Sequence, residues 1–276
     1  MRRKAVLWFS GMVFLWLLPY FFTIFLNGAD MAFLNRSPDV EDFLPAVLSC
    51  QIPDNYEIET VKAQSVIART NLCRKIENKD IFAETLNEIA DEIKQNHDCR
   101  VYLNPIYENA VKATEGKVLT ADGELKLIPY HEISSGKTRD GAEALHDKNY
   151  SYLKSVDSIA DKDSPFFLNS TYIPAQQMPD DLKVCERAGS GYVVSLSVDG
   201  NTLEGESFAR GLGLSSSDFT IRKIGSDIRF LCRGRGHGLG LSQYGGNAMA
   251  KEGCSWEEIL ETYFPAMEQT DLKNIE

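Results

Sequence analysis

Alternating glycines between residues 234 and 240 are the feature that most constrains how this chain of 276 residues can fold. Within the segment GRGHGLG, every second residue from Gly234 to Gly240 is glycine, and one histidine, His237, lies among them. Because glycine lacks a Cβ, it adopts positive φ and lets a ligand or another part of the backbone come close. Residues 227–233 before it are typical of a strand, and residues 242–251 after it are typical of a helix. The segment therefore predicts a tight strand–turn–helix joint that holds a histidine.

Two glycine-rich phosphate-binding motifs are excluded in this segment. A dinucleotide-binding loop needs G-x-G-x-x-G, and no starting position supplies all three glycines. A P-loop needs Gly-Lys-Ser/Thr after its four free positions, and that run is absent as well. The sequence therefore predicts no cofactor. Two alternatives stay open for His237, which are an accessible histidine in a ligand site and a buried histidine that stabilises the joint.

The N-terminus predicts a membrane anchor. Residues 5–26 carry no charge, and this run reaches the roughly 20 residues that cross a bilayer core. Arg2, Arg3 and Lys4 precede it, so the positive-inside rule leaves the N-terminus in the cytoplasm. A cleaved signal peptide is the alternative, with a shorter apolar core and a small-residue cleavage site. We expect residues 1–28 to form a cytoplasmic tip and transmembrane anchor, and residues 29–276 to form one extracytoplasmic domain.

The net charge and the cysteine content restrict which ligands, disulfides and metal sites are expected. The net charge of −11 argues against nucleic acid as a partner and against electrostatic capture of an anionic wall polymer, and it favours a neutral glycan. The six cysteines are compatible with disulfides in an exported domain. No C-x-x-C pair is present, so a zinc ribbon is not predicted and we expect no metal. Cys50, Cys185 and Cys232 are interpreted as buried thiols.

Hydrophobic periodicity predicts an α+β fold, in which one domain combines helices with antiparallel sheets. Apolar residues recur at three- and four-residue steps in some segments and alternate in others. Helices are expected over 39–48, 56–75, 80–95 and 242–251, with a helical turn over 207–214. Strands are expected over 111–114, 117–120, 124–130, 192–198, 202–207, 219–223 and 227–233. Residues 142–190 are predicted to form a polar, irregular excursion over the core.

Four sequence blocks carry a resemblance to one family. The glycine segment extends to GRGHGLGLSQYG and is followed by an aromatic-rich ending, ILETYFP. Upstream lie VLSCQIPDNYEIETVKAQSVIART at residues 47–70, AVKATEGKVL at 110–119 and YHEISSGKT at 130–138. The four blocks cover about residues 40–265. Taken in the order in which they occur along the chain, they resemble the stage II sporulation protein D and amidase enhancer family.

The resemblance implies a role in the cell wall, and one position departs from the family pattern. Members of the sporulation branch are lytic transglycosylases that cleave peptidoglycan glycan strands, and the glutamate of an E-M-P block is their catalytic acid. Here Gln51 occupies that position. An amide cannot deliver the proton, and general acid catalysis contributes ~10²–10⁴-fold to a rate. The resemblance therefore implies weakened or lost strand cleavage. A displaced carboxylate (Glu57, Glu59 or Glu132) or a non-catalytic amidase enhancer are the alternatives.

The same resemblance implies a set of site residues. Gln51 and His237 take the catalytic positions, and we expect His237 to lie in a cleft facing Gln51. The expected substrate-binding residues are Gln64, Arg69, Ser134, Ser135, Lys137, Thr138, Ser242, Gln243 and Tyr244. The alternative for each is structural: Ser134 and Ser135 fit a turn that bonds its own backbone, and tyrosines fit a core as well as a sugar-stacking surface. The implied partners are peptidoglycan glycan strands, the membrane through the N-terminal helix, and a cell-wall amidase or other sporulation proteins.

Overall fold

The computed structural model describes residues 40–76 and 104–275. By its contacts the chain divides into Met1–Asp42 and Phe43–Glu276, and apart from the start of the first helix all the structure below belongs to the second unit. Within the described ranges, we find no helix with the length and apolar character that crossing a membrane requires. The predicted anchor over 5–26 and the predicted helix over 80–95 lie outside these ranges.

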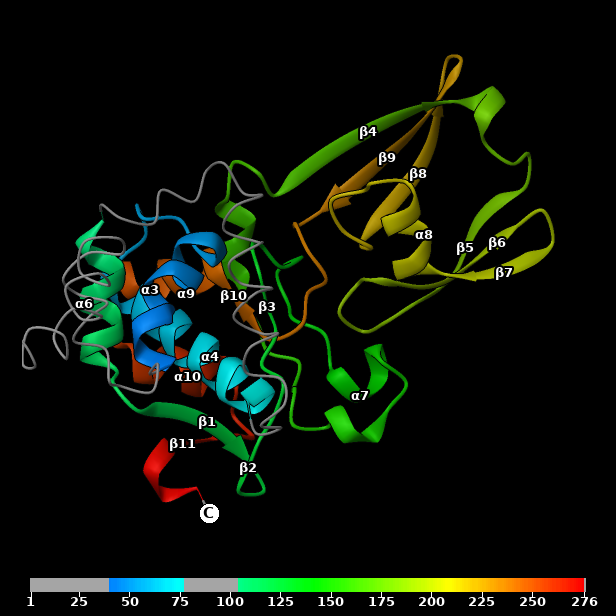
Figure 1. The fold of residues 1–276 in the computed structure, drawn as a ribbon. Helices are drawn as coiled ribbons and strands as arrows, with labels where there is room; N and C mark the ends of the chain where they lie inside the picture. The colour runs from blue at the N-terminus through cyan, green and yellow to red at the C-terminus, as the bar shows by residue number, and fades with distance from the viewer. Residues whose placement is uncertain (1–39, 77–103, 276) are drawn as a thin grey trace, which may run out of the picture. The chain divides into compact units, whose positions relative to one another are not determined.

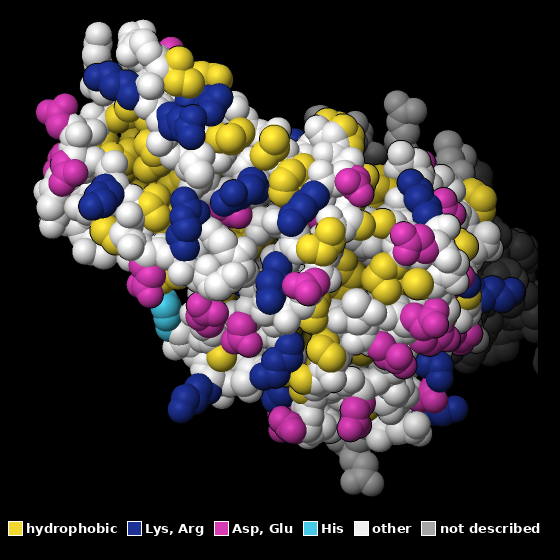
Figure 2. Space-filling model, turned by 180° about the vertical axis from the view of Figure 1, so that it is seen from behind, with side chains coloured by type: hydrophobic (Ala, Val, Ile, Leu, Met, Phe, Trp, Pro, Cys, Tyr) yellow, Lys and Arg dark blue, Asp and Glu magenta, His cyan; other side chains and the backbone are white. Residues whose placement is uncertain are grey.

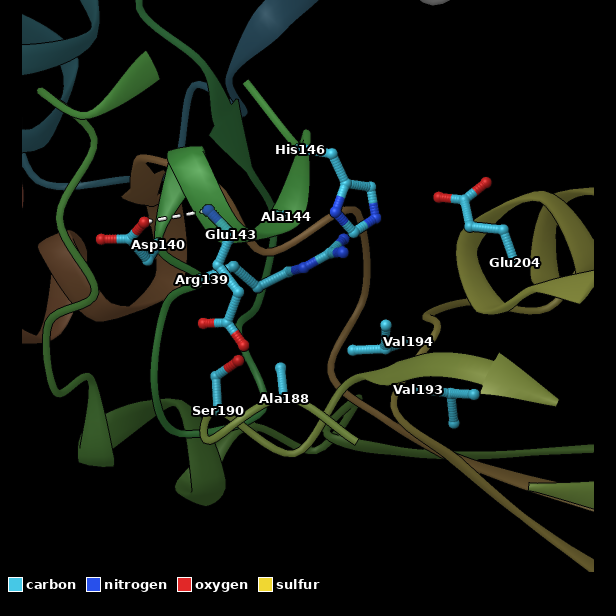
Figure 3. Close-up of a pocket in the computed structure, with 10 residues that line it drawn as sticks. All are labelled: Arg139, Asp140, Glu143, Ala144, His146, Ala188, Ser190, Val193, Val194 and Glu204. Atoms are coloured by element: carbon cyan, nitrogen blue, oxygen red, sulfur yellow. Dashed lines mark hydrogen bonds between the residues drawn. The ribbon is translucent and has the colours of Figure 1, made fainter. Parts of the chain in front are cut away.

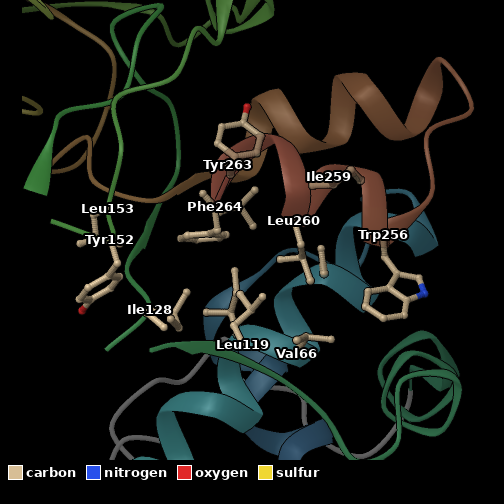
Figure 4. Packing of buried hydrophobic residues seen from close by; sticks show 14 residues of the cluster. Val66, Leu119, Ile128, Tyr152, Leu153, Trp256, Ile259, Leu260, Tyr263 and Phe264 are labelled. Atoms are coloured by element: carbon tan, nitrogen blue, oxygen red, sulfur yellow. The ribbon is translucent and has the colours of Figure 1, made fainter. Parts of the chain in front are cut away.

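A helical core surrounds α4 (Ile58–Ile76), as Figure 1 shows. Its neighbours include α3 (Val40–Gln51), α6 (Pro105–Ala113), α9 (Gln243–Lys251) and α10 (Trp256–Tyr263). Figure 4 shows Val66 packed with Leu119, Ile128, Leu260 and Phe264. The helix predicted over 56–75 is confirmed, but its burial extends all round, because nearly every residue from Thr60 to Thr70 is buried.

The strand predicted over 111–114 is wrong, because these residues end α6. Asn104 caps this helix, and its side-chain oxygen accepts a hydrogen bond from the Ile106 N–H at 3.0 Å. Pro105 follows at the first helical position, where its missing N–H costs nothing. This asparagine–proline start signal is present in the sequence and outweighs the β-branched residues that favour a strand.

Short strands cover the helical core. β1 (Lys117–Ala121) lies between β2 (Glu124–Leu125) and β11 (Glu268–Asp271), and both pairings are antiparallel. A hairpin joins β1 to β2 at Asp122 and Gly123, which have φ of 56° and 77°. The strand predicted over 124–130 is two strands, because β3 (Tyr130–His131) pairs in parallel with β10 (Leu241–Ser242).

The remaining strands form two three-stranded antiparallel sheets. One has the order β4-β9-β8, from Leu168–Pro174, Asp227–Arg233 and Phe219–Ile224. The other has the order β5-β6-β7, from Leu182–Arg187, Val193–Val198 and Asn201–Glu204. A second hydrophobic cluster, which includes Leu196, Phe219 and Phe230, joins the sheets to α8 (Gly205–Gly211). The α+β prediction is confirmed, with one parallel pair in addition.

The excursion over 142–190 is more regular than predicted. It contributes β4, β5, the end of α7 (Gly141–Ala144) and the short 3₁₀ helices η1 (Lys148–Tyr150), η2 (Ile159–Asp163) and η3 (Ala175–Gln177). A fourth, η4 (Leu272–Asn274), lies near the C-terminus. In β4, exposed residues alternate with half-buried ones, so only one face of the strand packs against the protein. Its polar residues therefore did not predict a strand.

Candidate functional site

Three glutamines from three helices meet at the end of α3. Gln64 Nε2 of α4 donates to Gln51 Oε1 at 2.9 Å. Gln243 Nε2, at the start of α9, donates to the Gln51 carbonyl oxygen at 2.8 Å and lies 3.2 Å from Gln64 Oε1. Gln64 and Gln243 are buried, while Gln51 is half-buried. The structure therefore brings these three predicted residues together, and only Gln51 among them keeps appreciable exposure.

The residue after Gln51, Ile52, is held in place by a hydrogen bond from α6. Tyr107 of α6 donates its hydroxyl to the Ile52 carbonyl oxygen at 2.8 Å, and the Ile52 side chain is buried. Burial raises the Tyr107 pKa to about 12, with a further contribution from Asp54, so the phenol stays a donor at neutral pH. Cys50 is disulfide-bonded, which corrects the expectation of a buried free thiol. The Gln51 backbone is thus positioned on both sides.

The parallel pair β3 and β10 directs two further residues toward this region. Strands that run in parallel end at the same edge, so Glu132 after β3 and Gln243 after β10 leave the pair together. The Tyr244 N–H donates to the Glu132 carbonyl oxygen at 3.0 Å. Burial raises the Tyr56 pKa to about 12, and the charges of Glu132 and Asp161 contribute. Tyr56, Glu132 and Tyr244 therefore share one neighbourhood, and the Glu132 side chain is exposed.

The glycine turn has the predicted positive φ angles. Its backbone comes close to other parts of the protein. Gly234, Gly236, Gly238 and Gly240 all have positive φ, between 69° and 105°. A Cβ at Gly240 would lie 2.0 Å from the Pro129 carbonyl oxygen. At Gly238 it would lie 2.3 Å from the Tyr192 hydroxyl. Because such contacts leave no room for a side chain, the sequence must place glycine wherever this turn crosses the β3 segment and Tyr192.

His237 is held within the turn. Its Nδ1 accepts a hydrogen bond from the Leu239 N–H at 3.0 Å, and its carbonyl oxygen accepts one from Arg139 Nη1 at 3.2 Å. Burial lowers its pKa and Arg139 adds to this, while Glu206 opposes the change. In the described part of the chain, no hydrogen bond or ring contact joins His237 to Gln51. The ring is half-buried, so the cleft hypothesis remains a prediction.

A second histidine, His131 of the YHEISSGKT block, lies beside the first. The ring centroids of His131 and His237 are 5.7 Å apart. Burial lowers the pKa of His131 to about 3, and His237 contributes to the shift, so His131 is neutral at physiological pH. Its Nδ1 lies 3.0 Å from the Leu239 carbonyl oxygen. Within the described ranges no group of three or more His, Cys, Asp or Glu side chains is arranged to hold a metal ion.

Asp161 is the residue that sequence reasoning missed. It is fully buried on η2, and its Oδ2 accepts from both the N–H (2.8 Å) and the hydroxyl of Ser134. Its Oδ1 accepts from the Ser242 hydroxyl at 2.8 Å. Burial raises its pKa, and these hydrogen bonds oppose that change. This carboxyl ties the excursion to β3 and β10. No motif marks it, because its partners are distant in sequence.

The predicted YHEISSGKT residues are mostly enclosed. Ser134 and Thr138 are fully buried, and Ser242, also predicted to bind substrate, is buried with them. Ser135 Oγ donates to the Ser190 carbonyl oxygen at 3.1 Å, and Lys137 Nζ lies 3.7 Å from Asp157. Ser134 Oγ accepts from the Gly136 N–H at 3.1 Å, as a turn that bonds its own backbone would, whereas the Ser135 partner is distant in sequence. Among the predicted binding residues of this block only Lys137 is exposed.

Arg69 lies inside the fold. Its side chain has no exposed surface, and it donates to the carbonyl oxygens of Val111 at 3.2 Å and Lys117 at 3.1 Å. It also donates to the Thr114 hydroxyl at 3.3 Å. These acceptors close the C-terminal end of α6 and the start of β1. The structure thus gives Arg69 a role in joining α4 to these elements, and the expected contact with a glycan is corrected because a fully enclosed guanidinium offers no surface to a ligand.

The carboxylates considered as replacement acids have distinct surroundings. Glu59 is held by Lys62 at 2.6 Å and accepts from the Trp256 N–H at 3.0 Å, so it stabilises the start of α10. The Glu57 N–H donates to Asn247 Oδ1 at 2.8 Å, and its side chain is exposed. Glu132, paired with Arg235 at 3.3 Å, is the one that leaves the β3–β10 edge beside Gln243.

A pocket lies beside Arg139, the residue that donates to the His237 carbonyl oxygen (Figure 3). It is lined by residues that include Arg139, His146, Ser190 and Glu204. Arg139 pairs with Glu206 at 2.9 Å, and its guanidinium lies 5.1 Å from the Tyr192 ring centroid. None of the three glutamines lines this pocket. We therefore place the candidate site at Gln51 and the β3–β10 edge.

Comparisons with known proteins agree with the family suggested by the sequence blocks. Residues 32–120 match the family model described as Stage II sporulation protein. The chain is 29% identical over 249 residues to Stage II sporulation protein D of Bacillus subtilis, covering 82% of this chain and 72% of that protein. It is 28% identical over 254 residues to the Bacillus amyloliquefaciens protein of that name, with 83% and 73% covered.

A shorter similarity connects the chain with a second kind of protein. It is 42% identical over 50 residues to a Bacillus subtilis protein named Amidase enhancer, covering 18% of this chain and 7% of that protein. The predicted family resemblance is therefore confirmed from two directions.

Proposed function

Since this chain is a relative of stage II sporulation protein D, we propose that it binds peptidoglycan glycan strands during sporulation and has weak or no lytic transglycosylase activity. One observation carries the proposal. The position of the expected catalytic acid holds Gln51, whose side chain accepts a hydrogen bond from the Gln64 amide and whose backbone carbonyl accepts one from the Gln243 amide. An amide group donates and accepts hydrogen bonds but supplies no proton to a leaving oxygen.

The chemistry of this neighbourhood suits sugar binding. Gln51, Tyr56 and Tyr244 are each half-buried, so all three residues keep some solvent-accessible surface. Hydroxyl and acetamido groups of a glycan exchange hydrogen bonds with such side chains, and phenol rings pack on the apolar faces of sugars. Gln64 orients the Gln51 side-chain amide and Gln243 fixes the Gln51 backbone carbonyl, which reduces the entropy lost on binding.

The test is the variant Gln51→Glu with glycan strands from which the stem peptides have been removed. The Gln64 amide that donates to Gln51 Oε1 would donate to the new carboxyl oxygen, so the change fits locally. We expect anhydro-muramyl ends, measured by mass spectrometry, to be near background for the wild type. We expect them to rise by ~10²-fold or more for the variant, since a general acid contributes at least that factor.

A displaced carboxylate is the competing possibility, and Glu132 is its best candidate because it leaves the β3–β10 edge next to Gln243. Glu132→Gln serves as the matched variant. Strong production of anhydro ends by the wild type, abolished by Glu132→Gln, would replace the first proposal with this one.

A second candidate function is stimulation of a cell-wall amidase, favoured by the 50-residue similarity to the amidase enhancer. In this role the protein binds the glycan and presents it to the partner enzyme. Adding the protein to a purified amidase should then raise the release of stem peptides. No change in peptide release would exclude it.

We further propose that residues 5–26 anchor the protein in the cell membrane, with the domain over 29–276 outside. The charge-free run after Arg2, Arg3 and Lys4 supports this orientation. Protease added to intact protoplasts should digest the domain. Protection of the domain would contradict the orientation, and a mature N-terminus near Ala29 would indicate a cleaved signal peptide.

A further inference from the structure

The outer face of the β4-β9-β8 sheet gathers arginines on a chain whose overall charge is strongly negative. Directly paired residues of neighbouring strands point to the same side of a sheet. Tyr172 of β4 pairs with Arg229 of β9, which pairs with Arg222 of β8, so these three form a row across all three strands. Leu168 pairs with Arg233 on the same side. We call this surface, with Ile224, the outer sheet face.

The opposite side of the sheet belongs to the interior. Ile173, Ile221, Ile228 and Phe230 all contact the second hydrophobic cluster. Strands alternate their side chains, so the arginine row must face away from that cluster. Tyr172 is 54% and Leu168 58% exposed, which is unusual for large apolar side chains. Figure 2, seen from behind, shows Lys and Arg side chains interspersed with hydrophobic ones on the part of the molecule that carries these strands.

Two of these arginines are unneutralised. Among the described residues, neither Arg222 nor Arg229 has an ion-pair partner, although they stand directly opposite each other. Like charges in this arrangement destabilise a sheet. Arg233 does bind the buried carboxylate of Asp218 through two hydrogen bonds, but Asp218 also pairs with Arg187, so the group keeps a net positive charge. The sheet therefore retains a repulsive arrangement that an anionic partner would relieve.

The outer sheet face continues toward the candidate site. Arg235 follows Arg233 in sequence by two residues, and its guanidinium lies 5.5 Å from the ring centroid of Phe166. The Phe166 side chain is 59% exposed. On its other side Arg235 pairs with Glu132, at the β3–β10 edge where Gln243 also emerges. Arg235 thus contacts Glu132 at the β3–β10 edge and Phe166 just before β4, which connects that edge with the sheet.

We propose that the outer sheet face is a second docking surface for the glycan strand, which recognises carboxylates carried by the strand. This rests on the proposed function, because it concerns the same polymer. A strand without stem peptides carries one carboxylate on each muramyl unit. Arginine binds carboxylates with a planar pair of N–H donors, and Tyr172 and Phe166 offer rings to sugar faces. A polymer with regularly spaced carboxylates and apolar sugar faces uses both kinds of side chain, whereas a purely ionic partner leaves the exposed rings unused.

The net charge of −11 predicts poor capture of anionic polymers, and the outer sheet face shows why that prediction does not extend to every surface. Net charge sums over the whole chain. Exposed charges act over about 8–10 Å at physiological salt, so a ligand senses mainly the charges of this face, where Arg222, Arg229 and Arg233 outnumber one carboxylate, Asp227. Under this proposal, the expectation of a neutral glycan does not extend to this face.

The test compares two double variants of the full chain in neutral detergent. Arg222→Gln with Arg229→Gln removes the unpaired charges, and Lys112→Gln with Lys251→Gln removes the same charge from exposed positions on α6 and α9. The probes are fluorescent peptide-stripped strands with free carboxylates and the same strands after amidation with methylamine. We expect the arginine variant to bind free-carboxylate strands about 3- to 10-fold more weakly, and the lysine variant to bind like the wild type. Added salt should narrow the difference.

Melting temperatures separate this role from a structural one. Because the two arginines repel each other, their removal should leave the melting temperature unchanged or raised. A lowered melting temperature would assign them to fold stability. Unchanged affinity of the arginine variant, equal binding of amidated strands, or displacement by polyglutamate at equal carboxylate concentration would each overturn the proposal. If the wild type binds neither probe, the proposed function itself fails.

Discussion

At the joint between β10 and α9, the buried side chains of Asp161 and Gln64 are paired within the protein, whereas the outer sheet face leaves arginines opposite one another without acidic partners. Asp161 and Gln64 are fully enclosed and use their hydrogen-bonding capacity on neighbouring residues. Arg222 and Arg229 have no such partners in the described chain. Buried groups must be satisfied internally, since water cannot reach them, while exposed groups are free for a ligand. The joint therefore positions a site, and the sheet face is suited to binding.

The largest expected effect tests the joint at its tightest contact. In Gly240→Ala, the new Cβ would lie 2.0 Å from the Pro129 carbonyl oxygen, and the residue would keep a φ of 69°. Strained φ and overpacking together should lower the free energy of unfolding by about 2–5 kcal/mol, measured by urea denaturation. Gly213→Ala, with φ of 64° and open space around its Cβ, isolates the φ cost of about 1–2 kcal/mol. Equal losses in the two variants would show that the joint can relax.

Removing the charge of Asp161 should give the next largest effect. In Asp161→Asn one carboxylate oxygen becomes an NH2 group, which donates and cannot accept, so either Ser134 or the Ser242 hydroxyl loses its acceptor, at about 1–3 kcal/mol. Asp163→Asn, an exposed neighbour, should change stability by less than about 0.5 kcal/mol. Denaturation of the three proteins at neutral pH measures both.

The pH dependence of this pair sharpens the prediction. Burial raises the folded-state pKa of Asp161, so the folded state binds its proton more readily than the unfolded state. The penalty for charging Asp161 is therefore present above its folded pKa and disappears as pH falls toward the ordinary value of 3.8. The stability of the wild type relative to Asp161→Asn should accordingly grow as pH is lowered from neutral toward about 4. A constant difference would contradict the raised pKa.

The sequence could predict features that depend on neighbouring residues, but not those that depend on contacts between residues distant in the chain. The glycine turn was predictable, because alternating glycines between a strand pattern and a capped helix favour a backbone of positive φ that crosses other segments closely. Asp161 was not, because its partners Ser134 and Ser242 are close only in three dimensions. The burial of Arg69 was also hidden, since periodicity suggested a one-sided helix and α4 is buried all round. The arginine row was invisible because the polar sequence of β4 predicts irregular structure, and only pairing brings Tyr172 beside Arg229.

His237 is intermediate between the buried, paired side chains of the joint and the unpaired arginines of the outer sheet face, because it is half-buried yet hydrogen-bonded. In His237→Ala the Leu239 N–H loses its acceptor, but the vacated space opens to solvent and water can replace it. We expect a loss of about 0.5–1.5 kcal/mol in unfolding free energy. If His237 also contacts a glycan, affinity for peptide-stripped strands should fall more than this stability change explains. A binding defect that disappears at temperatures where the variant is fully folded would assign the histidine to the joint alone.

The smallest effect concerns the outer sheet face and has the opposite sign. Arg222→Gln removes the charge opposite Arg229 and should raise the free energy of unfolding by about 0.2–1 kcal/mol. Lys223→Gln is the matched control, because its side chain is also exposed but points to the other side of β8, opposite Ile228. In 1 M salt the gain from Arg222→Gln should shrink, since the Debye length falls to about 3 Å. A gain that persists in salt would mean that helpful packing by glutamine, and not relief of repulsion, is its cause. A loss of stability would mean that the arginine side chain supports the sheet, and the contrast between the paired interior and the unpaired surface would then fail at this residue.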